Sequence, residues 1–480
     1  MKVGDIVKAT GGVLLRGDPA REVSPRAFST DSRTMRRGGI FIALKGPNFD
    51  GHDFIAEAFR KGATGVIVSK HIRDTSLREI MQLREKCPGH ETPRRKKCPD
   101  HETHTCIIKV ADTAKAYGAI ARYHRMRFDI PLIAVTGSNG KTTTKEMIAR
   151  ILSRRFDVLK NDGTKNNHIG VPETLLALAE GTDVAVLELG MNRLGEIRYL
   201  AGIAQPSIGV ITNIGPSHLE FLGSLGNVFK AKRELLERLP RGALAVINGD
   251  DPFLAKARAE RLRLITFGLG PRNDFRATDL RADRRGLAFR VNGRHQFRLN
   301  LLGVHNVYNA LAAIAISAHF KMGFPAMRAA LAPFAGCAMR LTAQGVGDIV
   351  FLNDAYNSNP LSMRYALDAL SDYETTGRRF IVAGDMLELG DKARPFHAQM
   401  GELVARSRVD YLLTIGRLSN EMSRSAIRAG MGPVRVRGCR THADAARALK
   451  ALARPRDVVL VKGSRQMEME KVIERFKELG

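Results

Sequence analysis

Residues 133–152 read IAVTGSNGKTTTKEMIARIL, a stretch in which an apolar run, a glycine-rich turn and an amphipathic segment follow one another. Lys141 and Thr142 open the amphipathic segment directly after the turn. Backbone N–H groups at the start of a helix, aided by the helix dipole, bind phosphate groups. We therefore predict a strand, a phosphate-binding turn and a helix. The residues expected at the nucleotide are Gly137, Ser138, Asn139, Gly140, Lys141, Thr142 and Thr143.

The spacing of the glycines departs from the common phosphate loop. The pattern G-x-x-x-x-G-K-[ST] would require glycine at position 135, where the chain has Val135. Gly137 stands only three residues before Gly140. A glycine turn that merely caps a helix is the alternative. The lysine and threonines at this junction favour a nucleotide, with Lys141 at the terminal phosphates and the Thr142 hydroxyl on Mg²⁺.

Short β-branched runs alternate with longer amphipathic segments along most of the chain. This alternation is typical of mostly parallel α/β sheets. Residues 273–302 are more polar, alternate with a period of two and predict antiparallel strands. We expect an α/β protein of three domains. They are a small α/β domain at residues 1–128, a central P-loop-type domain with a mostly parallel sheet flanked by helices at 129–336, and a Rossmann-like doubly wound domain at 337–480.

The 480 residues carry a formal net charge of +27 and include five cysteines. So few cysteines in a long chain do not form a disulfide framework, and no apolar run approaches the roughly 18 residues of a membrane span. The first residues lack the pattern of a secretory leader, so we predict a cytoplasmic protein without membrane insertion. The basic residues are spread widely with little aromatic interleaving. They predict attraction to a polyanionic substrate rather than nucleic acid binding.

Residues 87–106, CPGHETPRRKKCPDHETHTC, interrupt the α/β pattern with two near copies of one hexapeptide. Their spacing matches no common zinc pattern. We therefore expect a hydrophilic insertion at about residues 84–106 that arose by local duplication, rather than a zinc site. The side chains that could offer soft ligands are Cys87, His90, Cys98, His101, His104 and Cys106.

Polar side chains stand at the ends of two predicted strands that follow the phosphate loop. Glu188 ends the run VAVLE, and His218 lies in TNIGPSH after the next apolar run. Ligands bind at the carboxyl ends of the strands in parallel sheets of this kind. Each residue alone could be a helix-capping acid or a surface histidine. Their place beside the phosphate loop predicts that both are metal ligands, together with Thr142.

Eight motifs in order resemble the Mur ligase family. They are TGSNGKTTTKEM, NDGTKNNHIGVPETLL, LELGMNRLGEI, TNIGPSHLEFLGSLGNVFKAKREL, GVHNVYNALAA, NDAYNSNP, AGDMLELG and KGSRQMEME. The resemblance covers nearly the whole chain outside the Cys/His insertion. The phosphate loop of this family is G-x-x-G-K-T, which Val135 does not disturb. Within the family, the motifs are most similar to the members that join D-alanyl-D-alanine to UDP-N-acetylmuramoyl-tripeptide (UDP-MurNAc-tripeptide).

The resemblance implies a monomeric, ATP-dependent, amide-forming ligase of peptidoglycan-precursor synthesis. A substrate carboxylate would attack the γ-phosphate of ATP to give an acyl phosphate, and the amine of D-Ala-D-Ala would then displace phosphate. Two Mg²⁺ ions are expected, held by Thr142, Glu188, His218 and a carbamylated Lys232. With Lys141, the last three form the expected catalytic set. A solvated lysine on a basic helix face is the alternative for Lys232.

Further site residues follow from the resemblance, motif by motif. It implies Ser32, Arg33, Asn166 and Asn167 at the UDP-linked substrate, then Asn306, Arg340 and Asp354 at ATP, and Asn357, Asn359, Asp385, Lys462 and Arg465 near the dipeptide. Met339 stands where glycine is more usual before the arginine. Simpler interpretations are a turn with a surface charge at Arg33, a helix cap at His305 or Asn306 and a turn with a helix cap in KGSRQMEME.

Two other functions stay open at the level of sequence. A sister ligase that adds diaminopimelate or lysine is the first, although the D-N-P-R motif of the diaminopimelate enzymes is absent from this chain. The second is a basic protein that binds nucleic acid or other anions and merely retains a nucleotide fold. The intact set of Lys141, Glu188 and His218 argues against such a protein.

Overall fold

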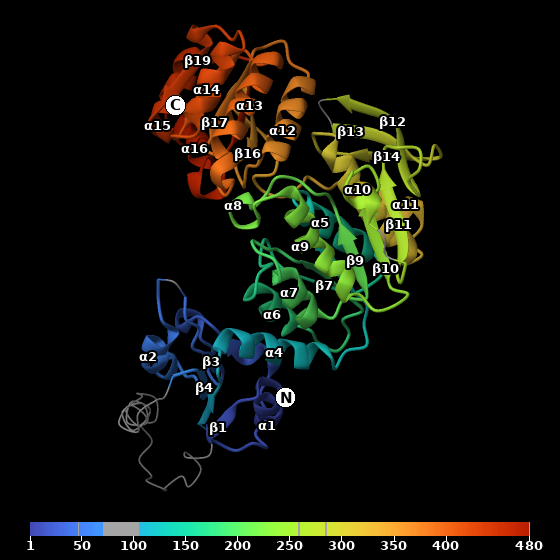
Figure 1. The fold of residues 1–480 in the computed structure, drawn as a ribbon, viewed down its shortest axis with the longest axis vertical. Coiled ribbons are helices and arrows are strands. Elements are labelled where there is room, and N and C mark those ends of the chain that lie inside the picture. Colours follow the sequence, from blue (N-terminus) through green and yellow to red (C-terminus); the bar gives the residue numbers. More distant parts are fainter. Residues whose placement is uncertain (47, 71–104, 258–259, 284–285, 480) are drawn as a thin grey trace. The chain divides into compact units, whose positions relative to one another are not determined.

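The structure is a computed structural model that describes residues 1–46, 48–70, 105–257, 260–283 and 286–479 (Figure 1). The chain packs into two units. The first consists of Met1–Ile130, Asn161–Thr182 and Leu200–Gln205, and the second of Pro131–Lys160, Asp183–Tyr199 and Pro206–Gly480. The chain therefore passes between the two units several times before residue 206.

The first unit is built on a five-stranded sheet in the order β1-β5-β4-β3-β2. Strand β1 pairs antiparallel with β5, and the other neighbours are parallel. Helix α2 packs on one face, where Phe41 and Phe59 belong to a buried apolar core. The elements are α1 (Val3–Thr10), β1 (Val13–Arg16), β2 (Phe28–Ser29), β3 (Ile40–Ile42), α2 (Ile55–Arg60), β4 (Gly65–Val68), β5 (Cys106–Lys109), α4 (Thr113–Arg125) and α6 (Gly170–Leu175).

Later parts of the chain complete this first unit. Helix α6 packs against α4. Nε2 of His124 lies 3.0 Å from the carbonyl oxygen of Leu178, and Nε of Arg125 donates to the carbonyl oxygen of Ala204 at 3.1 Å. Residues 161–182 and 200–205 thus belong to the first unit although they follow the phosphate loop in the sequence.

Cys106 begins strand β5 and is not part of an exposed loop. Its side chain is fully buried, and burial raises the pKa of the thiol to about 11. A buried thiol in a paired strand does not provide the exposed thiolate that the considered zinc set would need, so Cys106 does not belong to that set. The other five residues of the set lie outside the described residues.

The second unit begins with a nine-stranded sheet in the order β14-β13-β12-β11-β10-β9-β6-β8-β7. Helices α5, α10 and α11 pack on one face of this sheet in a continuous apolar core. The elements are β6 (Leu132–Thr136), α5 (Lys141–Leu152), β7 (Val158–Lys160), β8 (Val184–Glu188), α7 (Glu196–Ala204), β9 (Ile208–Ile211), α8 (Leu219–Leu222), α9 (Leu225–Arg238), β10 (Leu244–Asn248), β11 (Arg263–Gly268), β12 (Phe275–Asp283), β13 (Gly286–Val291), β14 (His295–Leu299), α10 (His305–His319) and α11 (Phe324–Leu331).

The strands of this sheet differ in how they are covered. Strands β6, β8 and β9 are buried along their whole length, as expected for parallel strands covered on both faces. Strands β12, β13 and β14 form an antiparallel meander whose burial alternates, which confirms the period-two prediction for residues 273–302. The carboxyl ends of β6, β8 and β9 carry the phosphate loop, Glu188 and the segment leading to His218.

A six-stranded sheet follows in the order β15-β16-β20-β17-β18-β19, with only β15 antiparallel among its described strands. Helices α15 and α16 share an apolar core with one face, and α12, α13 and α14 complete the doubly wound arrangement. The elements are β15 (Thr342–Val346), β16 (Ile349–Asp354), α12 (Pro360–Asp372), β17 (Arg379–Gly384), α13 (Ala393–Arg406), β18 (Tyr411–Ile415), α14 (Ser419–Arg428), β19 (Val436–Cys439), α15 (His442–Leu452), β20 (Val458–Lys462) and α16 (Glu470–Glu478).

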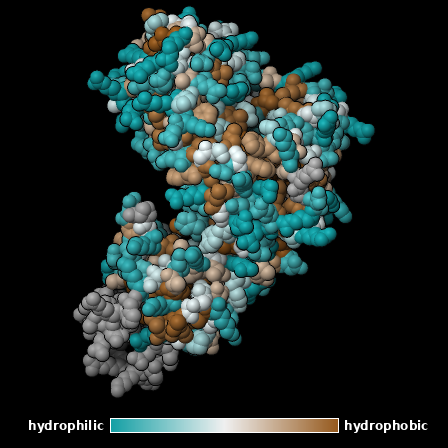
Figure 2. Space-filling model, viewed as in Figure 1, coloured by the Kyte–Doolittle hydropathy of each residue, from teal (hydrophilic) through white to brown (hydrophobic). Residues whose placement is uncertain are grey.

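The α/β fold class with three mostly parallel sheets confirms the prediction from the sequence. Hydrophilic side chains cover much of the visible surface, with smaller hydrophobic areas between them (Figure 2). Among the described residues, no helix combines the length and the apolar character that crossing a bilayer requires.

Candidate active site

The phosphate loop joins β6 to α5, and its two glycines have conformations that favour glycine. Gly137 has φ 150° and Gly140, at the start of α5, has φ 81°. A Cβ atom at position 137 would collide with Oγ1 of Thr212, and one at position 140 would collide with the side-chain amide of Asn309. The loop thus lies tightly against its neighbours. Its helix start offers backbone N–H groups that fit a phosphate, and Thr143 is buried in the first helical turn.

Lys141 folds back over this loop. Its Nζ donates to the carbonyl oxygen of Gly137 at 3.0 Å and lies 3.4 Å from that of Ser138. Burial lowers the pKa of Lys141, and the nearby Glu188 carboxylate opposes that shift. The positive charge of this ammonium group is therefore only partly balanced by its surroundings. The terminal phosphates of a nucleotide bound at the loop would supply the balancing negative charge.

The segment after β9 fixes the phosphate loop through buried polar contacts. Oγ of Ser138 accepts from the backbone N–H of Gly215 at 2.8 Å. The Asn213 side chain accepts from the N–H of Asn139 at 3.0 Å and donates to its carbonyl oxygen at 3.1 Å. Asp251 accepts from the N–H of Ile214 at 2.7 Å. These contacts hold the loop and the segment that leads to His218 in one arrangement.

Thr142, Glu188 and Arg340 meet beside the loop. Oγ1 of Thr142 donates to Oε2 of Glu188 at 2.7 Å, and a guanidinium nitrogen of Arg340 donates to the same hydroxyl at 2.9 Å. The guanidinium also stacks on Tyr356, 4.0 Å from the ring centroid. A hydroxyl and a buried carboxylate are hard oxygen donors, so this pair fits Mg²⁺.

His218 and Lys232 lie near the phosphate loop. His218 has φ 54°, and its Nδ1 is 2.7 Å from Oε2 of Glu388, which lowers the pKa of that carboxyl. Lys232 is buried in α9, and burial together with Lys141 lowers its pKa well below the ordinary value. Within the part of the chain that the structure describes, no three His, Cys, Asp or Glu side chains are grouped as a metal site. The metal-ligand roles of His218 and Lys232 stay predictions.

Asn306 and Asn309 lie in α10 and do not cap it. The residue before the helix is Val304, and no side chain caps this end. Asn306 donates to the carbonyl oxygen of Leu302 at 2.8 Å, so its interpretation as a helix cap is wrong. Oδ1 of Asn309 accepts from Oγ1 of Thr144 in α5 at 3.2 Å. This contact places the start of α10 against the phosphate-loop helix, and the predicted role of Asn306 at ATP stays a prediction.

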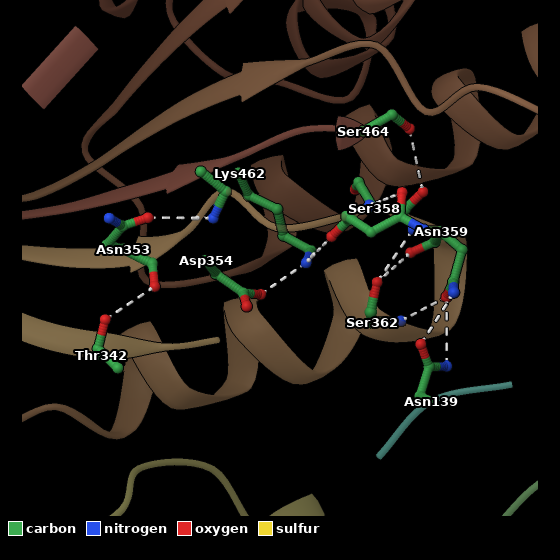
Figure 3. A network of polar contacts seen from close by, with 11 residues as sticks. Asn139, Thr342, Asn353, Asp354, Ser358, Asn359, Ser362, Lys462 and Ser464 are labelled. Carbon is green, nitrogen blue, oxygen red and sulfur yellow. Dashed lines mark hydrogen bonds and ion pairs between the residues drawn. The ribbon is translucent and has the colours of Figure 1, made fainter. Parts of the chain in front are cut away.

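Three of the predicted residues in the carboxyl-terminal part of the chain, Asp354, Asn359 and Lys462, belong to one network of polar contacts (Figure 3). Nζ of Lys462 lies 2.6 Å from Oδ2 of Asp354 and donates to the carbonyl oxygen of Asn357 at 2.9 Å. Asn359 caps α12 and pairs with Asn139 of the phosphate loop. Burial raises the pKa of Asp354 although Lys462 opposes the shift.

The remaining two predicted residues lie elsewhere in this part of the chain. Asp385 accepts from the backbone N–H of Ser419 at 2.7 Å and is buried. Arg465 opens a short 3₁₀ turn before α16 and forms an ion pair of 2.7 Å with Glu470. The interpretation of KGSRQMEME as a turn before a helix is consistent with this local structure. Roles of both residues at the dipeptide stay predictions.

In the first unit, the predicted substrate residues have local partners. Oγ of Ser32 donates to Glu57 at 3.0 Å, and Arg33 pairs with Asp31 at 2.9 Å on the surface. Asn167 accepts from the backbone N–H of Gly170 at 3.0 Å, at the start of α6. Asn166 also belongs to this segment, and its N–H donates to the carbonyl oxygen of Thr164.

A cavity of about 660 Å³ opens in the first unit beside Ser32 and Arg33, which do not line it. Its charged lining residues are Arg26, Asp31, Arg36 and Glu173, and Tyr117 adds an aromatic wall. Four residues of the segment STDSRT, which gave the sequence signal, line the cavity, and α6 contributes Glu173 from a distant part of the chain. Sequence reasoning missed these cavity residues, and it also missed the positioning residues Asn213 and Asp251.

Three family models match most of the chain. The model described as "Mur ligase family, catalytic domain" matches residues 26–125, "Mur ligase middle domain" matches 135–317, and "Mur ligase, glutamate ligase domain" matches 339–465.

Curated relatives are similar over nearly the full length. The UDP-N-acetylmuramoyl-tripeptide–D-alanyl-D-alanine ligase of Bacillus subtilis is 34% identical over 476 residues, covering 98% of this chain and 96% of the relative. The protein of the same name in Escherichia coli is 34% identical over 480 residues, covering 97% of each chain.

Solved structures agree with these relatives. MurF from Acinetobacter baumannii has a TM-score of 0.86 at 30% identity, covering 99% of this chain and 98% of that one. The MurF ligase from Thermotoga maritima in complex with ADP has a TM-score of 0.80 at 25% identity, covering 95% and 99%.

Proposed function

The chain belongs to the Mur ligase family, and we propose that it joins D-Ala-D-Ala to UDP-MurNAc-tripeptide with ATP as the energy source. The observation that carries this proposal is the phosphate loop, where Lys141 and the Thr142–Glu188 pair meet. Relatives with the corresponding name are similar along nearly the whole chain, which supports the choice of substrates. A related structure that holds ADP supports ATP as the nucleotide.

The proposed reaction has two steps that balance in atoms and charge. A carboxylate oxygen of the tripeptide attacks the γ-phosphorus of ATP, the bond to the β-phosphate oxygen breaks, and an acyl phosphate and ADP form. The amine of D-Ala-D-Ala then attacks the acyl carbon, phosphate leaves, and the nitrogen loses a proton. Both reactants of the first step are anionic, so Lys141 and the N–H groups of the loop supply the compensating positive charge.

Thr142 and Glu188 would hold Mg²⁺, and we assign His218 and a carbamylated Lys232 to a second ion. A bound Mg²⁺ would neutralise charge on the phosphoryl oxygens. The depressed pKa of Lys232 supports the carbamate because only the neutral amine adds CO₂. The contact of Arg340 with Thr142 places a positive charge beside the same oxygen donors.

Release of phosphate from ATP tests the substrate choice. Purified full-length protein receives ATP, Mg²⁺ and UDP-MurNAc-tripeptide, with D-Ala-D-Ala, diaminopimelate or lysine as the second substrate. We expect release with the dipeptide at least about a hundredfold faster than with either amino acid, because the site must recognise the dipeptide's own amide and carboxylate. Release with diaminopimelate or lysine but not with the dipeptide would identify a sister ligase instead.

We also propose that the cavity of the first unit binds the UDP portion of the substrate. Arg26 and Arg36 are cationic donors that suit a diphosphate, and Tyr117 offers an apolar wall. Ser32 and Arg33 would then act from the edge of this cavity, since their neighbours Asp31 and Thr34 line it.

The Arg36→Ala variant should raise the KM for UDP-MurNAc-tripeptide about tenfold and leave the KM for ATP nearly unchanged. The reason is the loss of a charge-assisted hydrogen bond to the diphosphate. Steady-state kinetics with each substrate varied in turn measures both constants. Arg37→Ala is the matched control, because Arg37 does not line the cavity. Equal effects of the two variants would contradict the assignment.

A further inference from the structure

The side chains of Asn139 and Asn359 form a reciprocal amide pair between the phosphate loop and the start of α12 (Figure 3). Nδ2 of Asn359 donates to Oδ1 of Asn139 at 2.9 Å, and Nδ2 of Asn139 donates to Oδ1 of Asn359 at 3.4 Å. The two residues are 220 positions apart in the sequence. Asn359 is buried, and Asn139 is half-buried.

The backbone of Asn139 is fixed without any help from its side chain. Its N–H donates to Asn213, and its carbonyl oxygen accepts from Nδ2 of Asn213 at 3.1 Å and from Oγ1 of Thr212 at 2.6 Å. The conformation of the phosphate loop therefore does not depend on the amide of Asn139. The side-chain amide of Asn139 forms its hydrogen bonds with Asn359 and not with the loop.

Asn359 is fixed within its own segment. Its Oδ1 accepts from the N–H of Ser362, and Oγ of Ser362 accepts from the N–H of Asn359, which together form a capping box. The two residues before it are also held, since Lys462 donates to the carbonyl oxygen of Asn357 and Oγ of Ser464 lies 3.4 Å from that of Ser358. Oδ1 of Asn359 accepts from the cap and, at 3.4 Å, from Asn139, whereas Nδ2 of Asn359 donates to Asn139.

Ser362 completes the cap of α12, and Thr212 and Asn213 hold the backbone of the loop. Neither structure needs the contact between the amides of Asn139 and Asn359. The pair connects two rigid supports. One is the loop that carries Lys141 and Thr142, and the other is the segment 357–359, which is held by Lys462 at the carboxyl end of β20. One hydrogen bond of 2.9 Å and a longer one of 3.4 Å join these supports and restrict their relative orientation.

We infer that Asn139 and Asn359 are positioning residues that hold the segment 357–359 against the phosphate loop, so that the second substrate's amine reaches the acyl phosphate formed there. The inference rests on the function proposed above and extends it to the second step. Asn139 would contact the nucleotide through the backbone of the loop, whereas its side-chain amide contacts Asn359. Loss of the pair should therefore impair amide formation and spare formation of the acyl phosphate.

The two steps can be measured separately with hydroxylamine. This small nucleophile attacks the acyl carbon, releases phosphate and leaves a hydroxamate, and it does not need the dipeptide-binding residues. The Asn359→Ser variant keeps an oxygen that can cap α12 but is too short to reach Asn139. We expect its kcat for dipeptide ligation to fall about tenfold, as the loss of two neutral hydrogen bonds implies, with hydroxamate formation changed less than about twofold.

Four further variants complete the experiment. Asn139→Ala should give the same selective loss, and the double variant Asn139→Ala with Asn359→Ser should be no worse than either single variant, because both remove one contact. Ser362→Ala weakens the cap but keeps the amide pair, so it should lower thermal stability without a selective loss of ligation. Asn359→Asp, which keeps the cap acceptor and loses the donor, replaces Asn359→Ser if that variant does not fold.

If the variants lost ligation and hydroxamate formation equally, the pair would only support the structure of the site. That result would overturn the inference. Unchanged ligation in Asn139→Ala and Asn359→Ser would also overturn it. Wild-type protein that forms hydroxamate but does not use D-Ala-D-Ala would refute the proposed second substrate, and the inference would fail with it. Wild-type activity on the dipeptide with unaffected variants separates failure of the inference from failure of the proposed function.

Discussion

The Lys141→Ala variant is expected to lose ATP-dependent phosphate release by at least about a thousandfold while it keeps its fold. The ammonium of Lys141 lies over the loop, where it donates to the carbonyl oxygen of Gly137, and the first step brings two anionic reactants together. Without the lysine, no other side chain of the loop offers a positive charge to the terminal phosphates. Among the described residues, the hydrogen bonds of the Lys141 ammonium go to the loop carbonyl oxygens of Gly137 and Ser138, so its removal should cost little stability.

Phosphate release with all three substrates measures the loss, and circular dichroism with thermal unfolding checks the fold. Lys141→Arg separates charge from geometry. Arginine keeps the positive charge but presents a planar group on a longer side chain, so we expect only partial recovery. Turnover by Lys141→Ala at the wild-type rate would refute the assignment of residues 137–143 as a phosphate loop.

The Lys462→Ala variant is expected to lower the free energy of unfolding by about 3–5 kcal/mol, because it leaves a buried carboxylate without its partner. The side chain of Lys462 is 1% exposed and that of Asp354 is 16% exposed, and Nζ of Lys462 lies 2.6 Å from Oδ2 of Asp354. Lys471→Ala is the matched control. Its partner Glu468 and the lysine itself are about half exposed, so the loss should stay below about 1 kcal/mol. Urea unfolding of the full chain at pH 7.5 measures both variants.

The loss in the free energy of unfolding caused by Lys462→Ala should become smaller as the pH falls. Burial raises the pKa of Asp354 in the folded protein, and Lys462 opposes that shift, so removal of the lysine raises this pKa further. A carboxyl whose folded pKa lies above its unfolded pKa binds protons more readily in the folded state, which favours folding at lower pH. Replacing both partners, Lys462→Met with Asp354→Leu, should recover much of the loss. Wild-type stability of Lys462→Ala at pH 7.5 would contradict the prediction.

Features that depend on neighbours in the sequence could be predicted. The phosphate loop needs a strand, two glycines and a helix start within a dozen residues, and the chain supplies them in that order. The long buried strands and the meander of residues 273–302 follow from periodicity alone. Glu188 was recognisable because a carboxylate at the end of an apolar run requires a partner, and the structure provides Thr142.

Features that depend on distant packing could not be predicted. Strand β7 at the edge of its sheet has only three residues, which are too few for a clear period. Asn213 and Asp251 act on backbone groups far from their own positions, so nothing beside them in the sequence indicates their role. The cavity of the first unit needs α6, which follows β5 by some sixty residues. Cys106 looked like the end of a polar insertion because its strand is only four residues long.

The way the chain returns to the first unit has a consequence for biosynthesis. Residues 161–182 and 200–205 belong to this unit, yet they follow Met1–Ile130 only after β6 and the phosphate loop have been made. On the ribosome, residues 131–175 must therefore be made after the amino-terminal sheet before α6 can cover α4. Expression of residues 1–130 alone would leave the apolar face of α4 without its natural cover. A stable fragment of this unit requires the polypeptide to extend to at least residue 205.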